Sequence, residues 1–132
     1  MPKIPSSGGY HSVNPYLVVD DAERLIAFLA EVFDGHEQGP RELAADGRID
    51  HADMRIGDSL VMVSQSSDAY PARPSVLFAY VDDVDATYRA ALRAGATSIA
   101  EPTPQPWGDR VGGFHDPFDN RWWIATHGGA VG

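Results

Sequence analysis

The segment Val19-Asp20-Asp21 recurs as Val81-Asp82-Asp83, 62 residues later in the chain (81 − 19). Each copy ends a run of alternating residues that is typical of a β-strand, and it begins a run with the period of an amphipathic helix. Carboxylates at such a junction favour a helix N-terminus, because they accept hydrogen bonds from its free N–H groups. We therefore predict that a strand and a helix follow each other twice.

The same offset of 62 aligns the rest of the two halves. Arg48-Ile49 matches Arg110-Val111, and Leu60-Val61-Met62 matches Trp122-Trp123-Ile124. Turn residues between these pairs predict a hairpin in each half. A further strand is expected before each hairpin, at about 37–43 and 97–101, and glycine caps are expected after the helices, at 34–35 and 95. Each half thus has the order strand, helix and three strands.

Length and composition fit one domain. A chain of 132 residues with 43% hydrophobic residues can bury a core without staples. The absence of cysteine excludes disulfides, thiolate metal sites and a cysteine nucleophile, so any metal would need nitrogen and oxygen ligands. We predict a single domain over residues 1–132, with unit one at about 12–64, a Ser- and Pro-rich linker at 65–74 and unit two at about 75–127.

The charge balance excludes several classes of partner. Nineteen acidic residues against ten Lys and Arg give a formal net charge of −9, which argues against a nucleic acid or an anionic membrane as partner. No stretch approaches the ~20 apolar residues of a membrane span, and the first residues, MPKIPSSGG, lack the features of a secretory signal. We therefore expect a soluble, cytoplasmic protein that binds neither nucleic acid nor membrane.

Three segments carry a resemblance to a known family. They are NPYL at 14–17, HADMRIGDS at 51–59, and WGDR at 107–110 followed by DPF at 116–118 and RWWIATH at 121–127. In this tandem arrangement they resemble the vicinal oxygen chelate superfamily (glyoxalase I, extradiol dioxygenases, bleomycin and fosfomycin resistance proteins) and, within it, the PhnB-like group. Asp119 replaces the glycine that the family usually has at this hairpin tip, and Asp tolerates the same left-handed turn.

The resemblance covers about residues 12–127 and implies an α+β fold. Two tandem βαβββ units would form a half-open mixed β-barrel around a cavity, with the helices outside, and the protein would be a homodimer. Side chains expected to face the cavity are Asn14, Tyr16, Val18, His51, Asp53, Arg55, Val76, Phe78, Tyr80, Val111, Gly113, His115, Arg121, Trp123, Ala125 and His127. Trp122 then faces the helix layer as part of the core. A three-residue loop, Gly57-Asp58-Ser59, would pair Ile56 with Leu60 and turn Val61 and Val63 inward.

The family's metal positions can be compared one by one. Metal-dependent members hold a divalent ion with His, Gln or Glu on the first and last strands of each unit. The matching positions here are Asn14, Val61, Val76 and Trp123. Only Asn14 offers an oxygen, and neither valine nor tryptophan can bind a metal ion. We therefore predict no family metal and no other cofactor.

A relocated metal site is the alternative. His51 and Asp53 lie two apart on one strand face, and His115 has the position that repeats Asp53. Two His and one carboxylate form a known arrangement for iron or manganese, to which Asn14 could add an oxygen. The same three residues are the candidate catalytic groups, because either His could act as a general base with Asp53 fixing its tautomer. Whether the protein is an enzyme stays open.

Aromatic and polar side chains of the cavity are the predicted ligand-binding residues. Planar or apolar molecules stack on aromatic walls, and arginine binds carboxylate or phosphate groups. The predicted set is Asn14, Tyr16, Arg55, Phe78, Tyr80, Trp107, Arg121 and Trp123. Three functions stay open: metal-independent binding of a small, partly aromatic or apolar molecule; a metal-dependent lyase, isomerase or dioxygenase with the relocated site; and an interaction module whose cavity is filled. The sequence favours the first.

Overall fold

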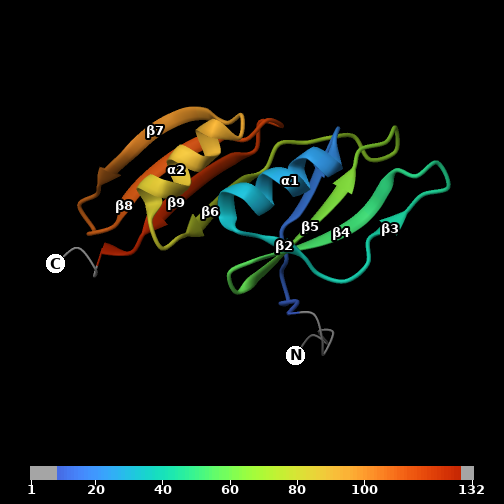
Figure 1. The fold of residues 1–132 in the computed structure, drawn as a ribbon, viewed down its shortest axis with the longest axis horizontal. Helices are drawn as coiled ribbons and strands as arrows, with labels where there is room; N and C mark the ends of the chain where they lie inside the picture. The colour runs from blue at the N-terminus through green and yellow to red at the C-terminus, as the bar shows by residue number, and fades with distance from the viewer. Residues whose placement is uncertain (1–8, 129–132) are drawn as a thin grey trace. The chain divides into compact units, whose positions relative to one another are not determined.

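A computed structural model describes residues 9–128 and contains two βαβββ units (Figure 1). The first unit consists of β1 (Tyr16–Val19), α1 (Ala22–Phe33), β2 (His36–Glu37), β3 (Glu42–Leu43), β4 (Ile49–Ile56) and β5 (Ser59–Gln65). The second consists of β6 (Val76–Tyr80), α2 (Val84–Arg93), β7 (Thr97–Pro104), β8 (Arg110–His115) and β9 (Arg121–Thr126). The α+β class with tandem βαβββ units is confirmed.

Each unit contains one sheet, and the two sheets have the same strand order. In the first unit β1 pairs in parallel with β5, which is antiparallel to β4, and both β2 and β3 pair with β4. In the second unit β6 pairs in parallel with β9, followed by β8 and β7. Both sheets are open, and the strands of residues 9–128 form no closed barrel. The chain divides after Arg73 into two compact parts, and the last turn of α1, Glu31–Phe33, groups with the second.

The strand expected at 37–43 is interrupted. The structure has two short strands there, β2 and β3, with Gly39 and Pro40 between them. Gly39 has a φ of 71°, and proline lacks the N–H that a ladder needs, so this stretch cannot continue as one strand. The counterpart in the second unit, β7, is continuous and runs three residues beyond its expected end at 101.

Both helices begin where the repeated aspartates predict. Asp21 and Asp83 are the N-caps, and each carboxylate accepts the backbone N–H three residues further on at 3.1 Å. α1 ends differently from the expected glycine cap, because Asp34 itself takes the left-handed conformation with a φ of 54°. Asp is one of the few non-glycine residues that tolerate this region.

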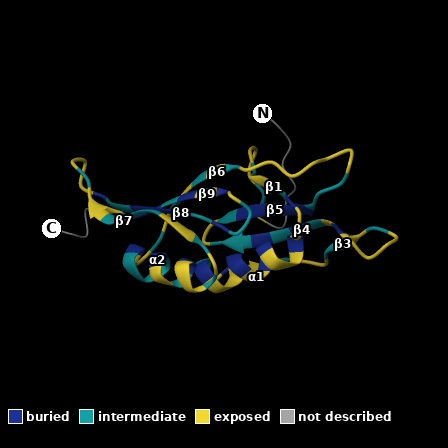
Figure 2. Cartoon of the chain, turned by 90° about the horizontal axis from the view of Figure 1, so that it is seen from above, coloured by how far each residue is buried: buried dark blue, intermediate teal, exposed yellow. Residues whose placement is uncertain are grey.

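The helix of each unit covers one face of its sheet, and the buried residues lie on the helices and on the strands that they cover (Figure 2). In the first unit the core includes Leu17, Val19, Leu25, Leu29, Ala52, Met54, Val61 and Val63, and in the second it includes Val84, Tyr88, Phe114, Trp122 and Ile124. The prediction that Trp122 belongs to the core is confirmed. No helix within residues 9–128 is long and apolar enough to cross a membrane.

The β4–β5 hairpin differs from the predicted register. Its loop has two residues, Gly57-Asp58, and Ile56 pairs with Ser59 rather than Leu60. Gly57 has a φ of 57°, as two-residue hairpin loops require. A shift of one residue in the pairing register moves every side chain of the strand to the opposite face of the sheet.

The prediction that Val61 and Val63 face the cavity side is therefore wrong. Both valines are buried on the helix side, opposite Met54 and Ala52. Met62 instead lies on the face that α1 does not cover.

The equivalence of His115 with Asp53 is wrong as well. The loop between β8 and β9 spans residues 116–120, and His115 pairs with Arg121 at the start of β9. Met62, the partner of Tyr16, corresponds to Trp123, the partner of Phe78. Leu60 therefore corresponds to Arg121, and Arg55, which pairs with Leu60, corresponds to His115. The constant offset fails because the two hairpins have loops of different length. Asp119 has a φ of 65°, which is the left-handed turn expected of it.

Candidate functional site

The predicted site residues that belong to strands lie on the open face of each sheet, which is the face that the helix does not cover. Asn14 lies just before β1, and Trp107 lies in the turn between β7 and β8. In the first unit Tyr16, His51, Asp53 and Arg55 alternate with residues buried on the helix side. Tyr16 pairs in register with Met62, which brings the polar positions of β4 and the start of β1 onto one surface.

A chain of three hydrogen-bonded side chains lies on this open face. His51 Nε2 is 2.7 Å from Asp53 Oδ1, and the Tyr10 hydroxyl donates to Asp53 Oδ2. The side chains of His51 and Asp53 are 26% and 13% exposed, so water reaches them only in part. Because an ionised carboxylate only accepts, the proton of this hydrogen bond is on His51 Nε2. The bond to Asp53 also raises the pKa of the Tyr10 phenol, which keeps Tyr10 a donor.

Arg55 and Asn14 both have partners inside the protein. The Arg55 Nε donates to Gln38 Oε1 at 2.8 Å. The Asn14 amide bonds twice to the backbone of His11: its Oδ1 accepts the N–H at 2.9 Å and its Nδ2 donates to the carbonyl at 2.7 Å. These contacts fix both side chains structurally, and a ligand would have to compete for them.

The side chains at the family's metal positions do not fit a divalent ion. The Asn14 oxygen is bonded to a backbone N–H, Val61 is turned to the helix side, and Val76 and Trp123 on the open face of the second unit have no metal-binding atom. Met62, which replaces Val61 on the open face, offers only a soft thioether.

The structure brings together two of the three residues of the relocated site. His51 and Asp53 are in contact, whereas His115 belongs to the second unit, where it pairs in register with Arg121. Within residues 9–128, no group of three or more His, Cys, Asp or Glu side chains is placed to hold a metal ion.

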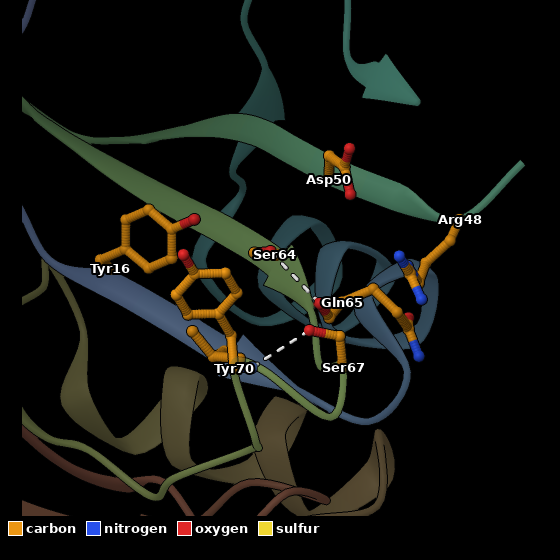
Figure 3. A pocket seen from close by; sticks show the side chains of 8 residues that line it. Tyr16, Arg48, Asp50, Ser64, Gln65, Ser67 and Tyr70 are labelled. Atoms are coloured by element: carbon orange, nitrogen blue, oxygen red, sulfur yellow. Dashed lines mark hydrogen bonds between the residues drawn. The ribbon is translucent and has the colours of Figure 1, made fainter. Parts of the chain in front are cut away.

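A pocket of about 380 Å³ opens beside β1 and β5 in the first unit (Figure 3). The predicted linker forms one of its walls. Arg73 pairs antiparallel with Val18, and the Ser67 Oγ accepts the Tyr70 N–H at 3.1 Å. The lining residues are Tyr16, Val18, Arg48, Asp50, Ser64, Gln65, Ser67 and Tyr70.

Aromatic side chains are exposed on the open face of the second unit. Phe78 and Tyr80, both on the edge strand β6, are 51% and 64% exposed, and their ring centroids are 5.2 Å apart. Trp123 lies against Gly113 on the neighbouring strand, where an added Cβ would come within 2.6 Å of the indole. The absence of a Cβ at Gly113 therefore leaves room for this ring.

Asp109 is a hydrogen-bond acceptor at one end of the open face of the second unit. Its buried carboxylate accepts the Gly128 N–H at 3.0 Å, His127 Nδ1 at 3.1 Å and the Tyr80 hydroxyl at 3.3 Å. The Gly128 N–H, with a further bond from the exposed Trp107 side chain, lowers the pKa of Asp109. The Asp109 carboxylate raises the pKa of the Tyr80 phenol in turn.

Two of these groups were not found from the sequence as site residues. Tyr10 lies in a loop before the first strand, and Asp109 belongs to the WGDR motif at 107–110, before β8. Neither follows a periodic pattern, so their partners could not be inferred. Asp109 comes directly before a predicted strand, and a short carboxylate at that place is the one signal in the sequence that could have marked it as a hydrogen-bond acceptor.

The fold and the open-faced sheets are those of a known protein family. Residues 10–124 match the Glyoxalase/Bleomycin resistance protein/Dioxygenase superfamily, and the chain belongs to it. The uncharacterized protein Mb0911c of Mycobacterium bovis is 37% identical over 122 residues, which cover 84% of this chain and 80% of that protein.

Solved structures of the same fold include TioX from Micromonospora sp. ML1. It has a TM-score of 0.73 and 26% identity, and the match covers 88% of this chain and 99% of TioX. A PhnB protein from Bacillus cereus has a TM-score of 0.69 and 15% identity with the same coverage.

Proposed function

We propose that this chain is a small-molecule binding protein of its superfamily, which holds a small, partly aromatic or apolar ligand without the family metal. One observation carries the proposal: exposed aromatic rings lie on the open faces, while the side chains at the family's metal positions are Met62, Val76, Trp123 and an Asn14 amide that is hydrogen-bonded to the backbone. Tyr16 and Phe78 occupy matching places on β1 and β6 and are each about half exposed.

The distribution of polar groups supports this proposal. Ligand pockets combine apolar or aromatic walls with a few polar groups that fix orientation. In the first unit, the ring centroids of Tyr16 and His51 are 6.1 Å apart, so an aromatic wall and the His51–Asp53 pair adjoin. Recognition of this kind needs complementary shape and hydrogen bonds, and no Lewis acid.

A second candidate function is metal-free acid–base catalysis by His51. The hydrogen-bonded chain from Tyr10 through Asp53 favours it, because a base oriented by a carboxylate is the usual arrangement for proton transfer. His51 would then take a proton from a bound ligand on Nδ1.

Thermal unfolding with a broad panel of aromatic compounds tests the proposal. A ligand at 100 times its dissociation constant should add about 2.7 kcal/mol to the free energy of unfolding, and Phe78→Ala or Tyr16→Ala should reduce the stabilisation. Leu92→Ala, an exposed apolar change on α2, is the matched control. Failure of the whole panel would favour an interaction module with a filled cavity.

Elemental analysis of protein purified without chelator or nickel resin tests metal independence. The proposal expects no stoichiometric metal. Stoichiometric metal that is lost in His51→Ala or His115→Ala would contradict it and favour a metal-dependent lyase, isomerase or dioxygenase. Membership of the PhnB-like group, a homodimer and a cytoplasmic location stay predictions.

A further inference from the structure

The start of β4 carries a β-bulge. Glu42 pairs with His51 and Leu43 pairs with Ile49, so Asp50 is the extra residue on β4. Regular alternation from Ala52 would bury position 50 under α1. In the structure Ile49 is buried instead, and Asp50 is exposed. Bulges are common next to functional sites because they redirect a side chain.

The bulge turns two opposite charges toward the pocket of the first unit. Arg48 and Asp50 lie two residues apart, on either side of buried Ile49, and both line this pocket. Figure 3 shows them at one end of the pocket, with the rings of Tyr16 and Tyr70 at the other end.

Arg48 is weakly held compared with other arginines of the protein. Among the described residues its one ion pair is a contact of 3.9 Å between Nη1 and the Asp46 carboxylate. Arg41, in contrast, contacts Glu23 and Glu37 at 2.8 Å each. The Arg48 guanidinium therefore keeps donors for a planar, two-oxygen acceptor, which it recognises best.

We propose that this pocket binds an aromatic zwitterion: a planar ring between Tyr16 and Tyr70, a carboxylate on Arg48 and an ammonium group on Asp50. The inference rests on the proposed function and adds the ligand class. A purely anionic ligand would meet the Asp50 carboxylate and a protein of net charge −9, and a purely cationic one would meet Arg48. A ligand with both charges pairs each of them. The hydroxyls of Ser64 and Ser67 lie between the two ends and offer further hydrogen bonds (Figure 3).

The test is an NMR titration with four probes that share one ring. L-Tryptophan carries both charges, indole-3-propionate only the carboxylate, tryptamine only the ammonium group, and 3-ethylindole neither. We expect L-tryptophan to bind tightest and each missing charge to weaken binding by about fivefold, as for partly exposed ion pairs. The backbone signals of Tyr16 and Tyr70 should shift, because their rings form the wall.

Two charge variants assign the ends of the ligand. Arg48→Ala should weaken the binding of L-tryptophan and indole-3-propionate and leave that of tryptamine unchanged. Asp50→Asn should weaken the binding of L-tryptophan and tryptamine and leave that of indole-3-propionate unchanged. The matched controls are Arg93→Ala and Asp58→Asn, at exposed positions that do not line the pocket. Arg48→Lys keeps the charge and should recover part of the affinity.

Several outcomes separate this inference from the proposed function. If 3-ethylindole binds as tightly as L-tryptophan, or if the Arg48 and Asp50 variants behave like the controls, the ligand class is wrong and aromatic binding stands. If none of the four probes binds, this inference is overturned. If the wider aromatic panel fails as well, the proposed function falls with it.

Discussion

Asp53 joins two donors of the candidate site, so removing its carboxylate should have a measurable effect on stability. In Asp53→Ala the His51 Nε2–H and the Tyr10 hydroxyl both lose their acceptor. A hydrogen bond contributes about 1 kcal/mol net, and these two are partly shielded from water. We therefore expect the free energy of unfolding to fall by about 2 kcal/mol in a urea titration near neutral pH.

A thermodynamic cycle with Tyr10→Phe isolates one of the two bonds. Tyr10→Phe alone should cost about 1 kcal/mol, and the double variant should cost less than the sum of the single variants by about the same amount. Asp58→Ala at the exposed hairpin tip is the control and should stay within about 0.5 kcal/mol of the wild type.

The pH dependence of the same bond has a definite sign. Asp53 raises the pKa of the Tyr10 phenol above its ordinary value. The contribution of the Tyr10–Asp53 hydrogen bond to the free energy of unfolding is therefore complete below about pH 10, and it is lost as the pH rises through the raised pKa. In Asp53→Ala the Tyr10 phenol should titrate at a lower pH, which an ultraviolet titration measures. An unchanged Tyr10 titration, or a stability loss under about 0.5 kcal/mol, would refute the reasoning.

Three further changes test individual side-chain contacts of the two units. Asp116→Ala should cost about 3–5 kcal/mol in a urea titration, because the buried carboxylate accepts four hydrogen bonds from its own loop and strand; a loss under about 1 kcal/mol would contradict this. Gly113→Ala should displace the Trp123 indole at a cost of about 1–3 kcal/mol, so an unchanged near-ultraviolet circular dichroism spectrum would argue against the contact. Arg41 lowers the pKa of Glu37, so this stabilisation is present above the ordinary Glu pKa of about 4.3 and is lost as the pH falls through the lowered value. Glu37→Gln should lack this acid-dependent loss, and identical stability profiles of the two proteins would count against the ion pair.

The sequence predicted those features that depend on local pattern. The caps at Asp21 and Asp83 follow from short-range hydrogen bonding, and the open-face positions of His51, Asp53 and Trp123 follow from the alternation of a strand. These interactions are made by neighbours in the chain, so a repeat of two short motifs was enough to place them.

Register and loop contacts could not be predicted in the same way. Gly57-Asp58-Ser59 is compatible with a two-residue or a three-residue loop. The structure has the two-residue loop, which places Val61 on the helix side. The bulge at Asp50 depends on the partner strand, and the contribution of Tyr70 to the pocket depends on a loop that returns to β1. Such features are decided by tertiary pairing, which a single sequence does not encode in any local pattern.

The central claim is ligand binding without a metal, and calorimetric titration of chelator-treated protein tests it most directly. With an aromatic ligand found in the thermal panel, the account predicts saturable binding whose affinity does not change when divalent metal is restored. Binding that appears only after metal is added back would contradict the account.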